Sequence, residues 1–211
     1  SDLRYLSMTE LIRLAETSGW RRPIVLVLGL TGMRWGELVG LRVKDVNLER
    51  RRLWIRRNVV EVDGELVVNT PKSDKWRQVV YPAILDDDMR SLVDGRKPDD
   101  ILFEQPGSGF LRRTHGPKSS SSWFYWAKKH ADIDNELTVH DLRHTAASLM
   151  VRAGANVKAV QRQLGHASAA MTLDVYADLF DDDLDAVGEA VNAMLLENVG
   201  KMWAKETSEA A

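Results

Sequence analysis

The amino-acid sequence predicts a mainly α-helical fold with a small antiparallel β-sheet, an α+β arrangement. Two observations indicate this class. Apolar residues recur at helical spacing near both ends of the 211-residue chain, whereas three segments between residues 52 and 81 have the composition of strands. Hydrophobic residues make up 44% of the chain, so it can bury a substantial core.

Three helices are expected first. Residues 7–10, Ser-Met-Thr-Glu, form a capping-box pattern that opens an amphipathic helix. Pro23 suits the first turn of a second, very apolar helix, and Gly32 can end it. A short helix is expected over residues 34–41. The apolar composition of the second helix predicts that it lies in the core.

The sheet is expected between residues 52 and 81. The strand-like segments are residues 52–56, 65–68 and 77–81, which are rich in Val, Ile, Leu and aromatic residues. Asp63-Gly64 is a typical hairpin turn and is expected to join the first two strands. Pro82 would end the sheet.

The second half of the chain is again helical. A helical pattern resumes near Leu85, and residues 104–122 are rich in Gly, Pro and Ser, which predicts a mobile loop. Residues 205–211 are expected to fray. Apolar periodicity predicts further helices at residues 123–131, 141–153, 157–164, 169–176 and 184–202.

Composition excludes several classes of protein. The chain has no cysteine, which rules out disulfides, thiolate zinc sites and cysteine nucleophiles. No apolar run approaches the ~20 residues of a membrane span, and no signal-peptide pattern opens the sequence. We therefore expect an intracellular protein without a membrane partner.

The net charge of −2 does not by itself indicate a nucleic-acid partner, but its distribution is informative. Residues 50–57 carry five arginines, residues 111–131 carry bases and no acid, and residues 178–189 carry acids and no base. Each run taken alone is compatible with solvated surface charge. The segregation predicts that a basic face coexists with an acidic tail.

Four chemically capable side chains lie close together in the sequence. His140 and Arg143 are spaced so that they share one helix face, where both can meet one anion. His166 follows Gly165 at an expected helix end, and Tyr176 comes shortly after. A tyrosine oxygen can attack a phosphodiester as a nucleophile. Taken singly, His166 fits a helix C-cap and Tyr176 fits the core, so the interpretation depends on the set.

Two further cations occupy positions suited to phosphate chemistry. Arg34 lies between two glycines that allow a tight turn, and an arginine held there can grip phosphate with two N–H groups. Pairing with Glu37 is the alternative. Lys72 lies between the second and third predicted strands, where it is either solvated or able to protonate a leaving oxygen. Lys75 competes for that role.

A metal site is an alternative interpretation of this region. His140 and His144 are spaced as metal-binding histidines on a helix often are, with Asp141 nearby. However, no glutamate lies next to the first histidine, and no third ligand is evident in the sequence. We therefore expect neither a metal nor a cofactor.

In this fixed order the residues make the chain resemble the tyrosine recombinases, the phage-integrase family of site-specific DNA recombinases. The resemblance extends from Leu6 to about Phe180, and its motifs are highly specific. The matching positions are residues 31–38 with Arg34, Lys72, residues 140–145 with His140 and Arg143, residues 164–166 with His166, and Tyr176.

The resemblance implies a tyrosine recombinase catalytic-domain fold and attack by Tyr176 on a DNA phosphodiester. The product would be a 3′-phosphotyrosyl link and a free 5′-hydroxyl, and the 5′-hydroxyl of another strand would reverse the step without ATP. Arg34 and Arg143 would clamp the nonbridging oxygens, and His166 would add a hydrogen bond. Lys72 would protonate the departing oxygen.

Two assignments complete the implied site. His140 would assist the deprotonation of Tyr176, because a phenol with an ordinary pKa of ~10 is a weak nucleophile at neutral pH. Glu37 would orient its neighbours. Two other functions stay open, a type IB topoisomerase that only relaxes supercoils and a DNA-binding module without activity. The histidine pattern and the complete set of catalytic residues favour the recombinase.

The resemblance also implies a domain organisation. Residues 1–180 would form the catalytic domain and residues 181–211 an acidic hinge with a tail helix, while the family's N-terminal core-binding domain is absent from the chain. The tail would dock either on its own domain or on a neighbouring protomer.

The implied partners are double-stranded DNA recombination sites. The full-length protein would act as a homotetramer on DNA, whereas this domain alone would be monomeric or weakly associated. Phage or mobile-element integration in a bacterial cytoplasm is the expected setting. Phosphate contacts are expected from the arginines of residues 50–57 and from Arg112, Arg113, Lys118, Lys128 and Lys129.

Overall fold

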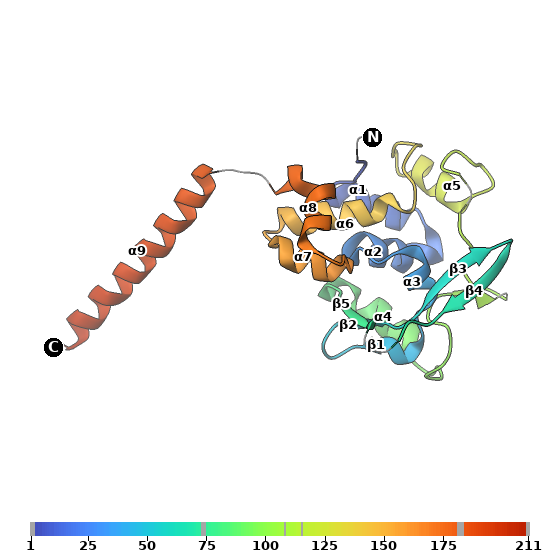
Figure 1. Cartoon of the computed structure of the whole chain (residues 1–211), viewed down its shortest axis with the longest axis horizontal. Helices are drawn as coiled ribbons and strands as arrows, with labels where there is room; N and C mark the ends of the chain where they lie inside the picture. Colours follow the sequence, from blue (N-terminus) through green and yellow to red (C-terminus); the bar gives the residue numbers. More distant parts are fainter. Residues whose placement is uncertain (1–2, 73–74, 108, 115, 181–183, 210–211) are drawn as a thin grey trace. The chain divides into compact units, whose positions relative to one another are not determined.

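The computed structural model describes residues 3–72, 75–107, 109–114, 116–180 and 184–209, and Figure 1 shows its helices and strands. Helices dominate and the strands form small antiparallel sheets, so the predicted fold class is confirmed. The chain divides into two units, Ser1–Leu179 and Phe180–Ala211. Most of the predicted acidic hinge falls on residues 181–183, which lie outside the described residues.

The first unit is built mainly from helices that the sequence predicts. Short 3₁₀ turns connect some of them, at Gly19–Arg21, Val43–Asp45, Ala83–Leu85 and Ala177–Leu179. The α-helices are α1 (Met8–Glu16), α2 (Arg22–Thr31), α3 (Trp35–Val39), α4 (Asp86–Val93), α5 (Trp123–His130), α6 (Asp141–Arg152), α7 (Val157–Leu164) and α8 (Ala169–Tyr176).

Local signals explain the ends of α1 and α2. The Ser7 hydroxyl accepts the backbone N–H of Glu10 at 3.2 Å, and the Glu10 carboxylate accepts the backbone N–H of Ser7 at 2.7 Å, as the capping box predicts. Pro23 lies in the first turn of α2, and Gly32 ends that helix with a φ of 75°. A Cβ at Gly32 would lie 2.4 Å from Leu164 Cδ2. Gly32 therefore lets the end of α2 approach α7 closely.

The strands differ from the prediction in their pairing. They are β1 (Val46–Asn47), β2 (Arg52–Ile55), β3 (Asn58–Val62), β4 (Glu65–Asn69), β5 (Arg77–Val80), β6 (Glu104–Gln105) and β7 (Gly109–Phe110). The strands β1, β2 and β5 form one antiparallel sheet, whereas β3 and β4 form a separate hairpin, and β6 and β7 form a short hairpin inside the predicted loop.

The predicted Asp63-Gly64 turn is present, but it joins β3 to β4. The expectation that it joins the strand at residues 52–56 to the next one was wrong, because β3 intervenes. Arg56 and Arg57 interrupt the run of apolar residues between β2 and β3, so the sequence pattern does not show β3 as a separate strand. Both arginines turn back to the buried Asp45, and the chain then continues as a new strand.

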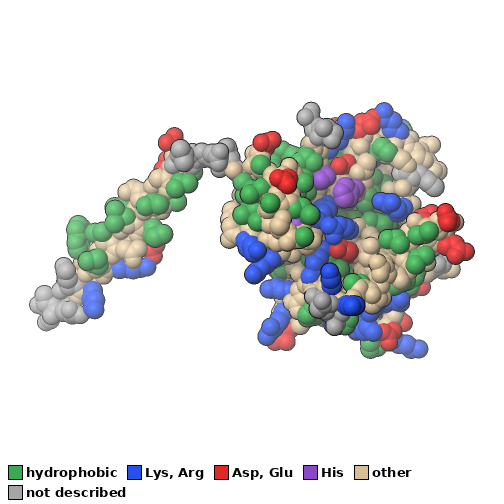
Figure 2. All heavy atoms as spheres, in the orientation of Figure 1, with side chains coloured by type: hydrophobic (Ala, Val, Ile, Leu, Met, Phe, Trp, Pro, Cys, Tyr) green, Lys and Arg blue, Asp and Glu red, His purple; other side chains and the backbone are tan. Residues whose placement is uncertain are grey.

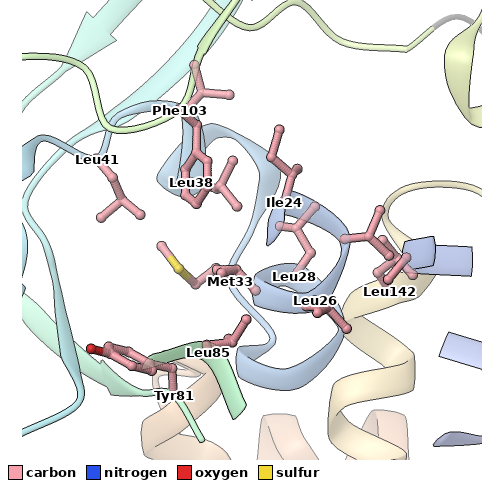
Figure 3. Close-up of a cluster of buried hydrophobic side chains, with 14 of the residues drawn as sticks. Ile24, Leu26, Leu28, Met33, Leu38, Leu41, Tyr81, Leu85, Phe103 and Leu142 are labelled. Atoms are coloured by element: carbon pink, nitrogen blue, oxygen red, sulfur yellow. The ribbon is translucent and has the colours of Figure 1, made fainter. Parts of the chain in front are cut away.

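Helix α2 lies at the centre of the core and contacts both α1 and α6. Figure 3 shows that Met33, which follows α2, extends between Leu41 and Tyr81. Met33 and Leu38 are almost completely buried. The segment that carries Arg34 is thus anchored in the core on both sides, which fixes the position of its backbone.

The second unit contains α9 (Leu184–Glu209). This helix continues beyond the predicted end at residue 202, because Ala204 and Lys205 favour a helix and neither Gly nor Pro occurs between residues 203 and 209. Its side chains Val187, Val191, Met194 and Leu195 are exposed. Among the described helices, none combines the length and apolarity that a membrane span requires.

Candidate active site

Tyr176 is the last residue of α8 and lies in the interior, with 2% of its surface exposed. Its hydroxyl is 2.7 Å from His144 Nδ1, and its ring stacks on His166 with the centroids 6.3 Å apart. Burial raises the pKa of the Tyr176 phenol, and the charge of Arg143 partly opposes this shift. The structure therefore holds the phenol protonated, with an imidazole in contact with its oxygen.

Arg143 is buried beside this phenol. Its Nη1 donates to the carbonyl of Gly32 at 2.5 Å, and its Nη2 donates to the carbonyl of Leu164 at 2.9 Å. Burial, together with repulsion from Arg34, lowers the pKa of Arg143 to about 10, so the group is still a cation at neutral pH. A guanidinium has five N–H donors, and these carbonyls occupy two of them. Arg143 thus fixes α6 to the ends of α2 and α7 and keeps donors for an anion.

The carboxylate of Glu37 is buried and orients two arginines. Its Oε2 accepts the backbone N–H of Arg34 at 2.9 Å and Nη2 of Arg77 at 2.8 Å, and its Oε1 accepts Nη1 of Arg34 at 3.3 Å. The side chain of Arg34 is 47% exposed, so its guanidinium reaches solvent from this anchor. The sequence-based expectation that Glu37 orients its neighbours has this geometric basis.

Arg77 is a residue of the site that the sequence analysis missed. Besides Glu37, its guanidinium donates to the carbonyl of Gln163 at 3.0 Å, and it packs against Gly165, where a Cβ would lie 2.3 Å from Arg77 Nε. A signal was available, because Arg77 alternates with Val79 of β5 and with Tyr81 just after it, and both of these side chains are buried. An arginine at an inward strand position indicates a buried ionic partner.

His166 lies just after the left-handed Gly165, and its Nδ1 is 2.8 Å from the Thr172 hydroxyl. Burial lowers the pKa of His166 to about 4, and the charges of Arg143, Arg34 and Arg77 contribute to the shift. The ring is therefore neutral at physiological pH. The same charges show that His166 lies within the cationic cluster.

His140 occupies the N-cap position of α6, and its ring is 5.3 Å from that of His144 in an edge-on arrangement. Burial and the charge of Arg143 lower the pKa of His140. The imidazole in contact with the phenol is thus His144, whereas the sequence-based hypothesis assigned the proton of Tyr176 to His140. Within the described ranges, no group of three or more His, Cys, Asp or Glu side chains is placed to hold a metal ion.

A cavity of about 640 Å³ opens beside these groups. Arg34, Arg113 and His140 line it together with residues of β3 and with Leu111, Thr114, Gly116 and Pro117. Figure 2 shows histidine side chains directly beside Lys and Arg side chains in the middle of the first unit. The cavity is therefore a recess bordered by two arginines and His140, while much of its remaining wall is apolar and includes Val59 and Phe124.

Lys72 lies apart from this cluster. Its side chain is exposed on the connection between β4 and β5, and its carbonyl accepts the backbone N–H of Lys75 at 2.9 Å. The base of this connection is held by Trp76, whose indole N–H donates to the carbonyl of Pro71 at 3.2 Å and whose ring lies 5.0 Å from the guanidinium of Arg56. The structure thus holds the base of the loop and leaves the ammonium of Lys72 facing solvent.

One predicted phosphate contact is wrong. Lys128 is completely buried, and its ammonium donates to the carbonyls of Pro117 at 2.9 Å, Asn135 at 2.6 Å and Leu137 at 2.7 Å. These bonds compensate the burial of the charge and hold the segment before α5 to the segment after it. Its neighbour Lys129 is exposed, with its ammonium 5.1 Å from the ring of Trp126.

The other predicted contacts of the segment 111–131 are exposed. Arg112 donates to the carbonyl of Gly64 at 3.2 Å, which places it at the tip of the β3–β4 hairpin. Arg113 lines the cavity, and Lys118 forms an ion pair with Glu136. Arg113 thus lines the recess, and Arg112 lies beside it at the tip of the hairpin.

The expectation for residues 50–57 is also corrected in part. Arg51 forms an ion pair with Asp86 at 2.8 Å. Arg56 and Arg57 pair with the buried Asp45 at 3.4 and 2.8 Å. Because carboxylates of the fold already engage these three arginines, they serve to hold the sheet rather than to form a free basic patch.

Comparison with known proteins gives the family. The profile of the Phage integrase family matches residues 3–182. An integrase assigned to prophage phiRv2 of Mycobacterium tuberculosis is 36% identical over 158 residues, covering 72% of this chain and 41% of that protein. The integrase of Mycobacterium phage L5 is 29% identical over 200 residues, covering 92% of this chain and 53% of that protein. The chain thus spans about half the length of the curated relatives that it matches.

Solved structures agree with this match. The Tn1549 transposon integrase (aa 82-397), in complex with circular intermediate DNA, superposes with a TM-score of 0.72 at 21% identity, covering 92% of this chain and 68% of that chain. The XerA recombinase superposes with a TM-score of 0.61 at 28% identity, covering 90% of this chain and 63% of that chain. The resemblance to the tyrosine recombinases is confirmed, and the chain belongs to the phage integrase family.

Proposed function

We propose that this chain is the catalytic part of a site-specific DNA recombinase that cleaves and rejoins DNA strands through a 3′-phosphotyrosyl intermediate at Tyr176. The observation that carries the proposal is the convergence of Arg143, His144 and His166 on one buried phenol. Such a set can activate and then stabilise a tyrosine nucleophile. Membership in the phage integrase family supports the same reaction.

In the proposed reaction the scissile phosphate lies in the recess beside Arg34. Charge develops on the nonbridging oxygens during the displacement, and Arg34 and Arg143 stabilise it with N–H groups that the fold has already oriented. The neutral His166 contributes a hydrogen bond to the same phosphate, and His140 lines the recess together with Arg34. No metal and no nucleotide cofactor enters this scheme.

Lys72 is proposed to protonate the departing 5′-oxygen. Its side chain is exposed beside Pro71, whose carbonyl accepts the indole N–H of Trp76, so the ammonium is accessible to a DNA strand. An ammonium is an effective general acid when it lies within hydrogen-bond reach of the leaving oxygen. In this scheme Lys75, on the same loop, is a phosphate contact.

The proposed biological task is the integration or excision of a phage or another mobile element. Its support comes from the relatives, which include integrases of a prophage and of a mycobacterial phage, and a transposon integrase in complex with circular intermediate DNA. The substrate would be double-stranded DNA that carries a recombination site. A bacterial cytoplasm is the proposed compartment.

Incubation with a pool of nicked duplexes of randomised sequence tests the proposal. A nick beside the cleavage point lets the short fragment with the free 5′-hydroxyl diffuse away, so the covalent protein–DNA species accumulates and its DNA can be sequenced. Absence of any such species would exclude the recombinase and favour a binding module. Joining of the recovered strand to a second duplex would distinguish recombination from simple relaxation of supercoils.

Replacing both Arg112 and Arg113 with Glu is expected to weaken binding to the recovered duplex by at least tenfold at low salt. Each lost phosphate contact also reduces the slope of log affinity against log salt by about 0.9. Fluorescence anisotropy at several salt concentrations measures both quantities. The same charge change at Arg90 and Lys97, which are exposed and line neither the recess nor the adjoining hollow that holds Arg112, is the control. Equal effects of the two double variants would rule out a specific DNA face.

We further propose that the full protein assembles as a homotetramer on DNA, with α9 docking on a neighbouring protomer. The exposed apolar side chains of α9 support this, since such a stripe is stabilised when another surface covers it. Removing residues 180–211 is expected to reduce the protomers bound per DNA, as measured by sedimentation. Trapping on a single nicked duplex should persist. Unchanged assembly would show that α9 serves its own domain.

A further inference from the structure

We infer that His144 accepts the proton of Tyr176 and is therefore a catalytic residue distinct from His140. This inference rests on the proposed function, because it describes how the phenol becomes a nucleophile. Neither the family motif nor the spacing of the sequence assigns such a role to His144. The assignment comes from the contact between this imidazole and the reacting oxygen.

The geometry favours His144 over the other imidazoles. Its Nδ1 is 2.7 Å from the Tyr176 hydroxyl, a distance at which a proton can transfer directly. His166 stacks parallel to the phenol ring, with an interplanar angle of 11°, so it presents its face and not a nitrogen to that ring. Since Tyr176 is only 2% exposed, bulk water is a poor acceptor for its proton.

The surroundings of His144 favour the neutral form of its ring. Burial lowers the pKa of His144, the neighbouring His140 and Arg143 lower it further, and Asp141 acts in the opposite direction. Together with Tyr176, these are the titratable groups of α6 and α8 that face the ring. A neutral imidazole with its proton on Nε2 offers a lone pair at Nδ1. At neutral pH, His144 is thus able to receive a proton.

The proposed step balances as follows. The proton of the Tyr176 hydroxyl moves to His144 Nδ1 while the phenolic oxygen forms a bond to phosphorus. The bond from phosphorus to the 5′-oxygen breaks, and that oxygen takes its proton from the proposed acid Lys72. His144 is then an imidazolium and returns its proton to the phenolic oxygen when the 5′-hydroxyl of a second strand reverses the reaction.

The test measures single-turnover cleavage of the recovered nicked duplex by the full chain. His144→Asn is expected to cleave about 100-fold more slowly, because an amide near the position of Nδ1 can hold the phenol but cannot take its proton. A fluorinated tyrosine at position 176 has a phenol that ionises at lower pH. It should raise the cleavage rate of His144→Asn at least tenfold. It should change the rate of the otherwise unsubstituted protein much less.

His140→Asn is the matched comparison, since it changes the other imidazole on the same face of α6. Its cleavage defect should not respond to the fluorinated tyrosine. Rescue of His140→Asn in place of His144→Asn would overturn the inference and assign the proton to His140. Full cleavage by His144→Asn, or a defect that the fluorinated tyrosine leaves unchanged, would also overturn it.

The pH dependence gives an independent readout that a purely structural role would not change. With His144 in place, cleavage should be flat near neutral pH and fall in acid as the ring protonates. In His144→Asn the rate should rise with pH, following ionisation of the phenol. Thermal midpoints and DNA affinities of the variants verify folding. If the unsubstituted chain forms no covalent species at all, the proposed function fails, and this failure is distinct from that of the inference.

Discussion

Replacing Tyr176 with Phe is expected to abolish the covalent protein–DNA species completely. The substitution removes only the attacking oxygen, and without it no 3′-phosphotyrosyl bond can form. The fold should persist, because the ring can still stack on His166 and one lost hydrogen bond costs about 1 kcal/mol. Denaturing gels of the nicked-duplex reaction measure the covalent species, and anisotropy measures DNA binding, which should be unchanged.

Tyr81→Phe is the control for this substitution. Tyr81 is as deeply buried as Tyr176, and within the described residues its hydroxyl has no hydrogen-bond partner. Removing that oxygen is expected to leave the covalent species at its full level and the stability unchanged or slightly higher. A covalent species that survives in Tyr176→Phe would place the nucleophile elsewhere in the chain.

Replacing Arg143 with Lys is expected to slow cleavage by about 100-fold or more and to destabilise the fold. A lysine keeps the charge, but one ammonium cannot reach the carbonyls of Gly32 and Leu164 and an anion at the same time. Each buried carbonyl left without a donor costs about 1–3 kcal/mol. The midpoint of thermal unfolding should fall by roughly 2–4 °C per kcal/mol, and rapid-quench kinetics would give the rate.

Arg34→Lys separates the two effects. The side chain of Arg34 is about half exposed and bonds to Glu37 without spanning two helices. Cleavage should therefore fall while the free energy of unfolding changes by less than about 1 kcal/mol. Equal losses of stability in both variants would contradict the structural role of Arg143, and normal cleavage by either would remove that arginine from the proposed site.

The helices could be predicted because their signals are local. Ser7 with Glu10, and the glycines 32 and 165, mark helix ends whatever the rest of the chain does. The strand β3 could not be found in this way. Its neighbours Arg56 and Arg57 resemble surface residues until Asp45, from an earlier segment, is known to lie beneath them.

In the site too, local signals could be predicted and contacts between distant segments could not. The structure brings together Arg143, His166 and Tyr176, which the resemblance grouped, but the resemblance could not tell whether His140 or His144 contacts the phenol. His140 and His144 share one helix face, and the packing of α8 on α6 decides between them. The prediction that Lys128 contacts phosphate was wrong, although the sequence contains a sign that this lysine is buried. It follows Phe124 at helical spacing and so lies on the buried face of α5.

The two carbonyl bonds of Arg143 have a consequence for how genes of this kind decay. A copy released from selection can lose Tyr176 and still encode a stable protein that occupies its DNA sites. A copy that loses Arg143 would lose catalysis and also the two hydrogen bonds that connect α6 to the ends of α2 and α7. Folded but inert descendants should therefore arise through the phenol, and such descendants would compete with active copies for the same DNA.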